Sequence, residues 1–378
     1  MTKQKIKYIS FYNHINEKTN RVSALSAINK IDYVIESLNI LDYDVELISP
    51  SWLTKDNNKK FISTKLNKVG RNTFIYTPSF RPINTMFSII TIFLSWTWLI
   101  LYLLRKCYKN EKVIVYHSLW LIFPIWIVKK IKNISVILEI EEIYSDVVDS
   151  HKKFSKCEHE FLNIADSYIF STKLLNDKIN LNNKPNITLY GIYKNNIISN
   201  KKYSKKIKIL YAGIIDSYKK GAFNAIQIAP YLNEKYEIHI VGFGEVDKLI
   251  NEINKINQIS LCKVSYDGLK SGYEFNQYCQ DFTIGLSTQT MEGEYLDTSF
   301  PSKILTYLSF GLIVISGRIK CVEKSKVINY VKFYDDFNPK QIAEVIINTS
   351  ITNKVNVLED LNKEFLLNLK YIISNENF

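Results

Sequence analysis

Residues 298–316, TSFPSKILTYLSFGLIVIS, contain a predicted helix start with a lysine in its first turn. Ser299 is placed to cap a helix that Pro301 opens, because proline lacks an N–H that the first turn leaves unbonded in any case. Gly311 is a typical helix end, and the apolar run after it is typical of a strand buried on both faces. Free amides, the positive end of the helix dipole and Lys303 together predict an anion site; the alternative is a solvated surface lysine.

Two glycine-containing segments earlier in the second half also follow predicted strands. Gly213 ends the strand in YAGII, where the missing side chain lets the backbone approach a diphosphate or a sugar. Lys220, in KKG, either reaches toward the same phosphates or is a plain surface lysine. Gly242 and Gly244, in VGFGE, form a turn after a strand, and a lone GxG is a weak signal by itself.

Acidic and basic residues also follow predicted strands in the first half. His117 lies at the carboxyl end of KVIVY, where ligand-facing residues collect; a buried structural histidine is the alternative. In ILEIEEIYSD, the strand register puts Glu139 and Glu141 on one face and turns Glu142 away. Acidic residues after such a buried run are costly unless they lie at its solvent edge or in a site.

Strands and helices alternate along both halves of the chain, a pattern typical of parallel, doubly wound sheets. We therefore predict an α/β fold with two doubly wound, Rossmann-like domains, residues 1–181 and 207–360, joined by an Asn- and Lys-rich linker at 182–206. An amphipathic C-terminal helix at 361–378 could cross back to the first domain. Ligands of such sheets bind at the carboxyl ends of the strands, so we expect the two sheets to face a cleft.

The composition is that of a globular protein: 378 residues, 46% hydrophobic and 23% charged. The net charge of +12 favours an anionic partner, which is a nucleic acid, an anionic membrane surface or a phosphorylated small molecule. Nucleic acid is disfavoured because no compact basic block with interleaved aromatic residues is present. The five cysteines form no CxxC pair, which indicates reduced thiols in a cytoplasmic protein rather than a zinc site or a disulfide framework.

One segment, residues 86–104, has 19 residues without a charge and is flanked by Arg81, Arg105 and Lys106. By length it could just span a bilayer. A strand-like segment follows within about ten residues and favours instead a helix that is buried or lies in the membrane interface, with its tryptophans near the headgroups. The N-terminus enters a strand directly and offers no signal peptide. We therefore expect a cytoplasmic protein that is peripherally associated with the inner face of the cell membrane.

The motifs YAGIIDSYKKG, IVGFGE, DGLKSGYEF and FPSKILTYLSFGLIVIS occur in this order between residues 207 and 345. In that order they resemble the nucleotide-binding domain of GT-B glycosyltransferases, in particular the family 4-like enzymes of bacterial surface polysaccharide synthesis. The resemblance implies transfer of a sugar, with retention, from a nucleotide-diphosphate sugar to a lipid-linked or glycan acceptor. The FPSK variant is similar to capsule or exopolysaccharide transferases. Cationic side chains and helix dipoles would do the charge work, so neither a cofactor nor a metal is expected.

The resemblance also implies roles on the donor side. Gly213, Gly242 and Gly244 would shape the nucleotide pocket, Lys220 would reach the phosphates, and the loop of Gly268, in YDGL, would hold the base. Family 4 enzymes usually carry a Glu-x7-Glu pair and an arginine, but here Thr298, Thr306 and Ile214 stand in those places.

Two features of the second half could compensate for these departures. Ser302 and Lys303, on the same helix as Thr306, could supply the cation that Ile214 lacks. Glu292 and Glu294, in MEGEY, either face the sugar or belong to a solvated loop.

On the acceptor side, the family places an acidic or His/Asp element after the corresponding strand. Glu141 and Glu142 are accordingly candidates for the general base or for contacts with the acceptor hydroxyl, and His117 joins them as a catalytic candidate. Arg21, in the loop EKTNRVS, could bind an acceptor phosphate or could simply cap a turn. The departures at Thr306 and Ile214 keep a second hypothesis open: a non-catalytic GT-B homologue that acts as a binding or scaffold subunit of a transferase complex.

Overall fold

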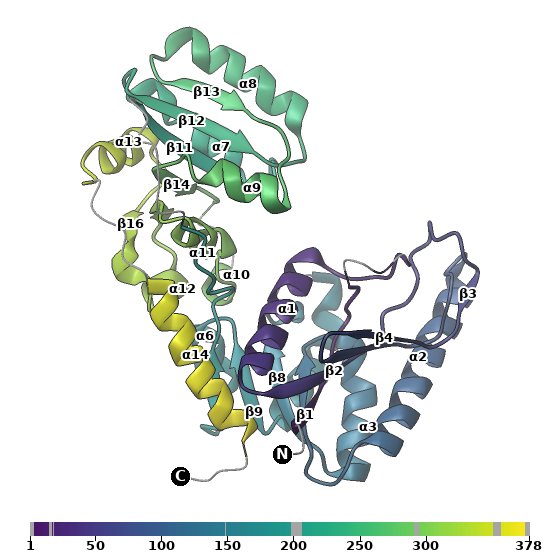
Figure 1. Ribbon diagram of the computed structural model, residues 1–378. Helices are drawn as coiled ribbons and strands as arrows, with labels where there is room; N and C mark the ends of the chain where they lie inside the picture. The colour runs from purple at the N-terminus through teal and green to yellow at the C-terminus, as the bar shows by residue number, and fades with distance from the viewer. Residues whose placement is uncertain are drawn as a thin grey trace. The chain divides into compact units, whose positions relative to one another are not determined.

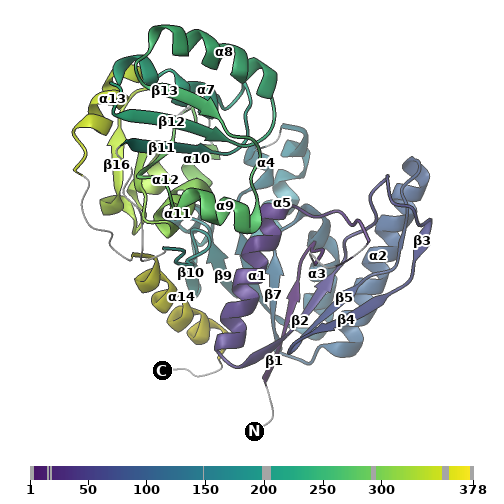
Figure 2. The ribbon, with the colours of Figure 1, turned by 45° about the horizontal axis from the view of Figure 1, so that its top comes forward.

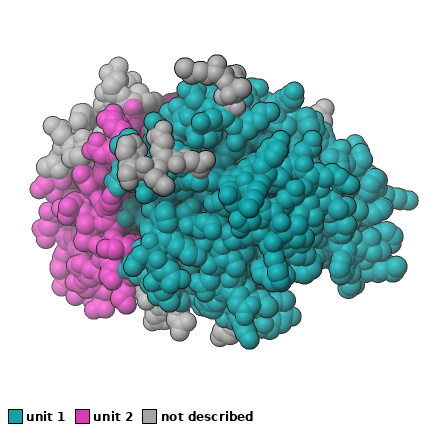
Figure 3. All heavy atoms as spheres, turned by 90° about the horizontal axis from the view of Figure 1, so that it is seen from below, with its two compact units in different colours: residues 1–171, 175–192, 364–378 teal, residues 172–174, 193–363 magenta. Residues whose placement is uncertain are grey.

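The computed structural model describes residues 4–14, 17, 19–147, 149–197, 206–290, 295–350 and 357–374 (Figure 1). The chain forms two compact units, coloured separately in Figure 3: unit 1 is residues 1–171, 175–192 and 364–378, and unit 2 is residues 172–174 and 193–363. The sequence-based division put a linker at 182–206 and a last helix at 361–378. In the structure unit 2 takes over at Tyr193, and the chain returns to unit 1 at Glu364.

Unit 1 is built on an eight-stranded sheet with the order β10-β9-β8-β7-β1-β2-β5-β4. Neighbouring strands are parallel except for β4, which pairs antiparallel with β5. β3 (Phe61–Ile62) and β6 (Ser79–Phe80) form a separate antiparallel pair. The strands of the large sheet are β1 (Gln4–Ile9), β2 (Tyr43–Ser49), β4 (Lys65–Val69), β5 (Asn72–Tyr76), β7 (Lys112–Tyr116), β8 (Ser135–Ile140), β9 (Ser167–Phe170) and β10 (Asn186–Thr188).

Helices cover both faces of this sheet. On one face Leu99 and Leu103 of α2 (Thr85–Lys106) share a core cluster with α3 (Ile122–Lys132) and α5 (Ser155–Ile164). α1 (Leu25–Ile40) covers the opposite face. Side chains alternate along a strand, so Glu139 of β8 points away from the core cluster, and Lys30 of α1 lies 3.9 Å from it. The remaining helical segments are α4 (Tyr144–Val147), α6 (Lys173–Ile179), α14 (Val357–Ile373) and the 3-10 turns η1 (Leu119–Leu121) and η2 (Asp149–Phe154).

Unit 2 has a six-stranded sheet, entirely parallel, with the order β13-β12-β11-β14-β15-β16. Its strands are β11 (Ile207–Ala212), β12 (Tyr236–Val241), β13 (Lys263–Tyr266), β14 (Ile284–Ser287), β15 (Ile313–Gly317) and β16 (Val331–Tyr334). Its helical segments are α7 (Gly221–Ile226), η3 (Ala229–Tyr231), α8 (Val246–Ile259), α9 (Gly272–Cys279), α10 (Tyr295–Thr298), α11 (Ser302–Ser309), α12 (Lys320–Glu323), η4 (Ile328–Tyr330) and α13 (Pro339–Ile347). Figure 2 shows helices layered on this sheet. The prediction of two Rossmann-like, doubly wound domains is confirmed.

Each sheet reverses its strand order at one point. In unit 1 the reversal lies between β1 and β7, and in unit 2 it lies between β11 and β14. Loops that leave the carboxyl ends of such neighbouring strands diverge to opposite faces and leave room for a ligand. The loops after β1 and β7, and those after β11 and β14, are therefore where binding residues should be sought.

The segment that the sequence singled out forms α11 and β15, with one difference at the start. α11 begins at Ser302, and Pro301 occupies the cap position with an extended backbone and no side-chain hydrogen bond. The predicted cap by Ser299 is therefore wrong, because Ser299 lies too far upstream of the helix. Gly311 ends the helix as predicted, with φ of +63°.

α2 is, among the described residues, the one helix long and apolar enough to cross a membrane, by length and composition only. It nevertheless packs on the sheet of unit 1. Besides Leu99 and Leu103 in the core, the hydroxyl of Ser95 donates to the carbonyl of Pro50 at 2.8 Å. The structure therefore places α2 as a layer of unit 1.

Candidate functional site

The ammonium of Lys303 lies at the carboxyl end of β11. A Cβ atom added to Gly213 would stand 3.1 Å from Nζ of Lys303, so the absence of a side chain at Gly213 is what leaves room for the ammonium. The same nitrogen lies over the ring of Tyr211, 4.1 Å from its centroid. β11 is one of the two strands at the reversal point of unit 2, so the cation sits where parallel sheets bind ligands.

Tyr307, one turn beyond Lys303, fixes α11 against the sheet. Its hydroxyl accepts a hydrogen bond from the amide of Ala212 at 2.9 Å and donates to the carbonyl of Leu286 at 3.1 Å. Its ring fills the space over Gly285 in β14, where an added Cβ would lie 2.3 Å from a ring carbon. α11 is thereby held across β11 and β14, and the position of Lys303 follows from that anchorage.

The ammonium of Lys303 is half-buried and has no counter-ion among the described residues. Burial, with a smaller contribution from the charge of Lys219, lowers the pKa of Lys303 to about 8, while Asp216 opposes the shift. The ammonium of Lys303 makes no hydrogen bond or ion pair with the residues that the structure describes. Such a cation gains from any anion that replaces the missing counter-ion.

The start of α11 adds unbonded amides to this cation. In the first turn, the amide of Ile304 donates a hydrogen bond to the carbonyl of Pro301, at 3.0 Å. The amides of Ser302 and Lys303 have no acceptor within the described ranges. Donors at a helix start beside a half-buried lysine are suited to phosphate oxygens.

The glycine turns line up at the carboxyl ends of β11, β12 and β13. Gly242 has φ of +150°, and an added Cβ would lie 1.8 Å from the carbonyl oxygen of Gly213, so no other residue fits there. Gly244 is excluded from carrying a side chain in the same way, by the carbonyl oxygen of Ile215 at 2.1 Å. The amide of Gly242 donates to the carbonyl of Gly268 at 3.1 Å. Gly213, Gly242 and Gly268 therefore lie side by side.

The other donor-side candidates lie near this edge but do not converge on Lys303. Lys220 is exposed at the start of α7 in a left-handed conformation with φ of +54°. Ser302 is exposed, and the hydroxyl of Thr306 donates to its carbonyl at 3.3 Å within the helix. Ile214 is 51% exposed. Two further candidates, Glu292 and Glu294, lie outside the described residues.

His117 of unit 1 follows β7 and is buried, at 1% exposure. Its Nε2 is 2.8 Å from Oε1 of Glu158. Glu158 also accepts the amides of Tyr144 and Ser145, at 2.8 and 2.9 Å. Burial alone would raise the pKa of Glu158, but the hydrogen bonds from His117 and Ser145 hold it at about 2. The imidazole is thus hydrogen-bonded to a carboxylate through Nε2, while its Nδ1 is buried and has no hydrogen-bond partner in the described structure.

Glu139 and Glu141 face Lys30 of α1, as the strand register predicted. Lys30 forms an ion pair with Glu141, lies 3.9 Å from Oε1 of Glu139, and donates to the carbonyl of Leu189 at 3.0 Å. Glu139 is fully buried and accepts the hydroxyl of Tyr8. Burial raises the pKa of Glu139 to about 7, against the opposing charge of Lys30.

Only the outer members of this acidic run are accessible. Glu141 is half-buried and keeps 30% of its side chain exposed beside Lys30. Glu142 is half-buried as well. Glu141 and Glu142 are therefore the carboxylates that a substrate could still reach, whereas Glu139 belongs to the core.

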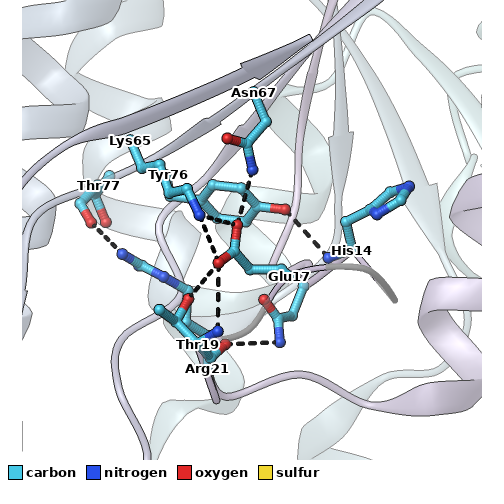
Figure 4. Close-up of polar contacts among 9 residues, drawn as sticks. His14, Glu17, Thr19, Arg21, Lys65, Asn67, Tyr76 and Thr77 are labelled. Atoms are coloured by element: carbon cyan, nitrogen blue, oxygen red, sulfur yellow. Dashed lines mark hydrogen bonds and ion pairs between the residues drawn. The ribbon is translucent and has the colours of Figure 1, made fainter. Parts of the chain in front are cut away.

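Arg21 is 4% exposed and lies inside unit 1. Its guanidinium donates to the carbonyl of Thr77 and lies 5.2 Å from the centroid of the Tyr76 ring (Figure 4). It also donates to the carbonyl of Ser51. Burial lowers the pKa of Arg21 to about 10. Arg21 thus ties together the segments that follow β2 and β5, which is the structural alternative to the acceptor-phosphate role.

The sequence reasoning missed a second polar group in the same loop. Figure 4 shows the carboxylate of Glu17 at the centre of this group. Lys65 donates to both oxygens of Glu17, at 2.7 and 2.8 Å, and Asn67 donates at 2.8 Å. The hydrogen bonds outweigh burial and lower the pKa of Glu17. Lys65 and Asn67 are two residues apart on β4 and therefore share one face of the strand. This spacing of polar residues was the one signal for the group in the sequence.

The described residues also bear on metals and cysteines. Within the described ranges, no group of three or more His, Cys, Asp or Glu side chains is placed to hold a metal ion. The five cysteines form no disulfide bond, and four of them are buried.

Comparisons with known proteins show the fold. No protein-family model matches the chain, and no curated protein sequence matches it. Among solved structures, a glycosyltransferase from Rickettsia africae is 14% identical, with a TM-score of 0.64 over 100% of both chains. The structure described as trehalose-6-phosphate from E. coli bound with UDP-2-fluoro glucose is 11% identical, with a TM-score of 0.64 over 97% of this chain and 96% of that chain. Anabaena HepE in complex with UDP is 10% identical, with a TM-score of 0.60 over 97% of this chain and 100% of that chain.

These matches extend over both units and show that the chain has the GT-B fold, with two Rossmann-like domains. The predicted fold class is confirmed. At 10–14% identity the likeness carries no residue-level assignment, so the roles of individual side chains rest on the geometry described above.

Proposed function

We propose that this protein is a glycosyltransferase that takes a sugar from a nucleotide-diphosphate sugar. The observation that carries the proposal is the ammonium of Lys303, held against Gly213 at the carboxyl end of β11 without a counter-ion in the described chain. The GT-B fold and the neighbours that contain UDP or UDP-2-fluoro glucose support this choice of ligand.

In this proposal Lys303 stabilises the leaving nucleotide diphosphate. Negative charge grows on the bridging phosphate oxygen as the bond to the sugar breaks, and a preorganised cation with free amides stabilises that charge most strongly in the transition state. The diphosphate would supply the counter-ion that Lys303 lacks and would keep it protonated. The proposed reaction uses these protein charges and needs neither a metal nor a cofactor. Retention of configuration is part of the proposal and rests on the family 4 resemblance.

The acceptor in this proposal is a lipid-linked or glycan hydroxyl in the synthesis of a surface polysaccharide, such as a capsule. Glu141 and Glu142 are the accessible carboxylates after β8 and are the proposed contacts for that hydroxyl. The ion pair with Lys30 would hold the carboxylate of Glu141 in position. His117 is the remaining candidate and would act through its unpartnered Nδ1.

Calorimetric titration with a panel of nucleotide-diphosphate sugars tests the donor site. At least one member should bind the wild-type chain. Lys303→Met keeps the apolar stem but removes the charge, and should weaken that binding by roughly 10- to 100-fold, because a hydrogen bond to a charged group is lost. A matched control is Lys340→Met, since Lys340 is an exposed lysine that also occupies the second position of a helix in unit 2.

Two results would overturn the proposal or part of it. If none of the nucleotide sugars binds the wild-type chain, the transferase proposal fails. If Lys303→Met binds as tightly as Lys340→Met, Lys303 is not part of the site.

The second candidate function is a non-catalytic GT-B homologue that serves as a binding or scaffold subunit. It is favoured by Thr306, whose hydroxyl bonds within its own helix, and by the exposed apolar side chain of Ile214. Neither supplies the carboxylate or the guanidinium that the family resemblance leads one to expect. Donor turnover separates the two functions: release of free nucleotide in the presence of a polysaccharide-linked or lipid-linked acceptor extract requires an enzyme, whereas tight binding without release favours the scaffold.

A further inference from the structure

The outward face of α2 is more apolar than its buried face. The residues it turns inward are Thr91, Ser95, Leu99 and Leu103. The hydroxyl of Thr91 donates to the carbonyl of Phe80 at 3.1 Å, and that of Ser95 donates to the carbonyl of Pro50. A helix that borders water shows the reverse pattern, with hydroxyl and charged side chains outside. The outward face of α2 therefore lacks the polar composition of a helix surface that is exposed to water.

Large apolar side chains on α2 and α3 form one exposed surface, which we call the α2–α3 face. The two helices pack side by side (Figures 1 and 2). The ring centroids of Trp96 and Phe123 lie 5.4 Å apart. Its exposed members are Met86 (67%), Ile89 (50%), Phe93 (60%), Leu101 (45%), Phe123 (49%), Trp126 (46%) and Ile131 (63%). Contiguous exposure of this kind marks an interaction site.

The charge on this face is of one sign. α2 and α3 contain no acidic residue. Arg105 and Lys106 are exposed in the last turn of α2, and Lys130 lies over the ring of Trp126 at 5.0 Å. None of these three cations has an ion-pair partner in the described chain. Apolar side chains with tryptophans beside unpaired cations are complementary to the acyl chains and headgroups of an anionic bilayer.

A row of aromatic rings leads from this face to the carboxyl edge of the unit 1 sheet. Trp96 contacts Phe93 at 6.0 Å and donates its indole N–H to the carbonyl of Trp120 at 2.8 Å. Trp120 meets Trp52 at 5.3 Å, and Trp52 meets Phe11 at 5.1 Å. Phe11, Trp52 and Trp120 follow β1, β2 and β7, so the row ends at the reversal point of the sheet.

We propose that the α2–α3 face docks the protein on an anionic phospholipid bilayer, without spanning it. α2 cannot span while its hydroxyl-bearing face is bonded to Pro50 and Phe80 in unit 1. Where the proposed transferase function holds, the aromatic row gives the acceptor class: a lipid-linked acceptor whose apolar tail reaches the sheet edge from the membrane. A second copy of the chain is the competing occupant of this face.

Sedimentation with vesicles tests the docking face in the absence of any nucleotide sugar. Wild-type protein should sediment with vesicles that contain phosphatidylglycerol, and should bind pure phosphatidylcholine vesicles on the order of 10-fold more weakly. The double variant Phe93→Ser, Trp126→Ser should lose most of this binding. Its matched control is Phe243→Ser, Leu269→Ser, at two side chains of unit 2 that are 55% and 62% exposed. A charge pair, Arg105→Gln, Lys106→Gln, should weaken binding to phosphatidylglycerol vesicles by about 10-fold.

The outcomes separate this proposal from the transferase function. Equal sedimentation of the face variant and its control, or no binding of wild-type protein, overturns the docking face while donor titrations stay unaffected. A wild-type dimer that becomes monomeric in the double variant, seen by light scattering, assigns the face to a second copy and overturns the proposal. Donor binding that fails while vesicle binding persists refutes the transferase and leaves the docking face standing.

Discussion

Three charged side chains of unit 1 and Lys303 of unit 2 differ in whether they have partners within the described fold. In unit 1 Arg21 donates hydrogen bonds to two backbone carbonyls. Glu158 is hydrogen-bonded to His117, and Glu17 accepts a hydrogen bond from Lys65. In unit 2 Lys303 is held against Gly213 with no counter-ion among the described residues. A charge satisfied inside the fold stabilises that fold, whereas a charge left unsatisfied costs stability and is retained where a ligand uses it.

This difference is the basis for the proposed roles of the two units. In the proposal, Lys303 of unit 2 meets a phosphate, and the half-buried carboxylates, the aromatic row and the apolar face of unit 1 meet the acceptor and the bilayer. If the comparison is right, removing the charges of unit 1 should lower stability, and removing that of Lys303 should not. All five tryptophans belong to unit 1, so their fluorescence reports the unfolding of that unit by itself.

The largest effect is expected for Arg21→Met. The carbonyls of Ser51 and Thr77 would be left buried without their donor, which should lower the free energy of unfolding of unit 1 by about 3 kcal/mol. Urea denaturation followed by tryptophan fluorescence measures this loss. Arg105→Met, at an exposed arginine of the same unit, should change stability by less than about 0.5 kcal/mol. If Arg21→Met is as stable as wild type but has a raised KM for the acceptor, Arg21 binds an acceptor phosphate instead of stabilising unit 1.

A smaller, pH-dependent effect is expected for Glu158→Gln. The pKa of Glu158 is held at about 2, below its ordinary value of 4.5, so its carboxylate contributes stability above about pH 4.5 and loses it as the pH falls toward 2. The variant should be less stable than wild type by about 2 kcal/mol at neutral pH, and the gap should close on acidification. Glu160→Gln, at an exposed residue of the same helix, is the control. A gap that does not change with pH would contradict the assignment of Glu158 as a hydrogen-bonded carboxylate with a lowered pKa.

The smallest effect on stability is expected for Lys303→Met. The pKa of Lys303 is lowered to about 8, below its ordinary value of 10.5, so between these values the unfolded chain binds a proton that the folded chain has lost. Wild-type stability should therefore rise with pH across that window, and the variant should lack this rise. At pH 7 the variant should be equally or slightly more stable, by less than about 1 kcal/mol. Circular dichroism during urea denaturation checks this, with Lys340→Met as control; a clear loss of stability would make Lys303 structural.

Much of the fold was predictable because its signals are local. Apolar β-branched runs alternate with amphipathic helices, and this alternation leads to two parallel sheets. The end of α11 at Gly311 and the strand β15 were predicted from a few adjacent residues. The start of α11 was not, because Ser299 and Pro301 are both acceptable near a helix start and only packing decides between them.

The candidate site was predicted in part. Lys303, Gly213 and Gly242 were named from residue type and spacing, and the structure brings them together. The group around Glu17 was missed, because Glu17 and its donor Lys65 lie far apart in the chain. His117 and Glu141 were correctly placed after strand ends and Arg21 in the loop that follows the first strand, but nothing in the sequence revealed the partners that each of them has.

The sequence by itself determined the two doubly wound sheets, the place of Lys303 in the first turn of a helix and the apolarity of α2, because each depends on residues that are neighbours along the chain. Only the tertiary structure decided that Lys303 lies against Gly213 with no counter-ion among the described residues, and which face of α2 points outward. Those properties depend on contacts between residues far apart in sequence, such as Lys303 with Gly213 and Ser95 with Pro50.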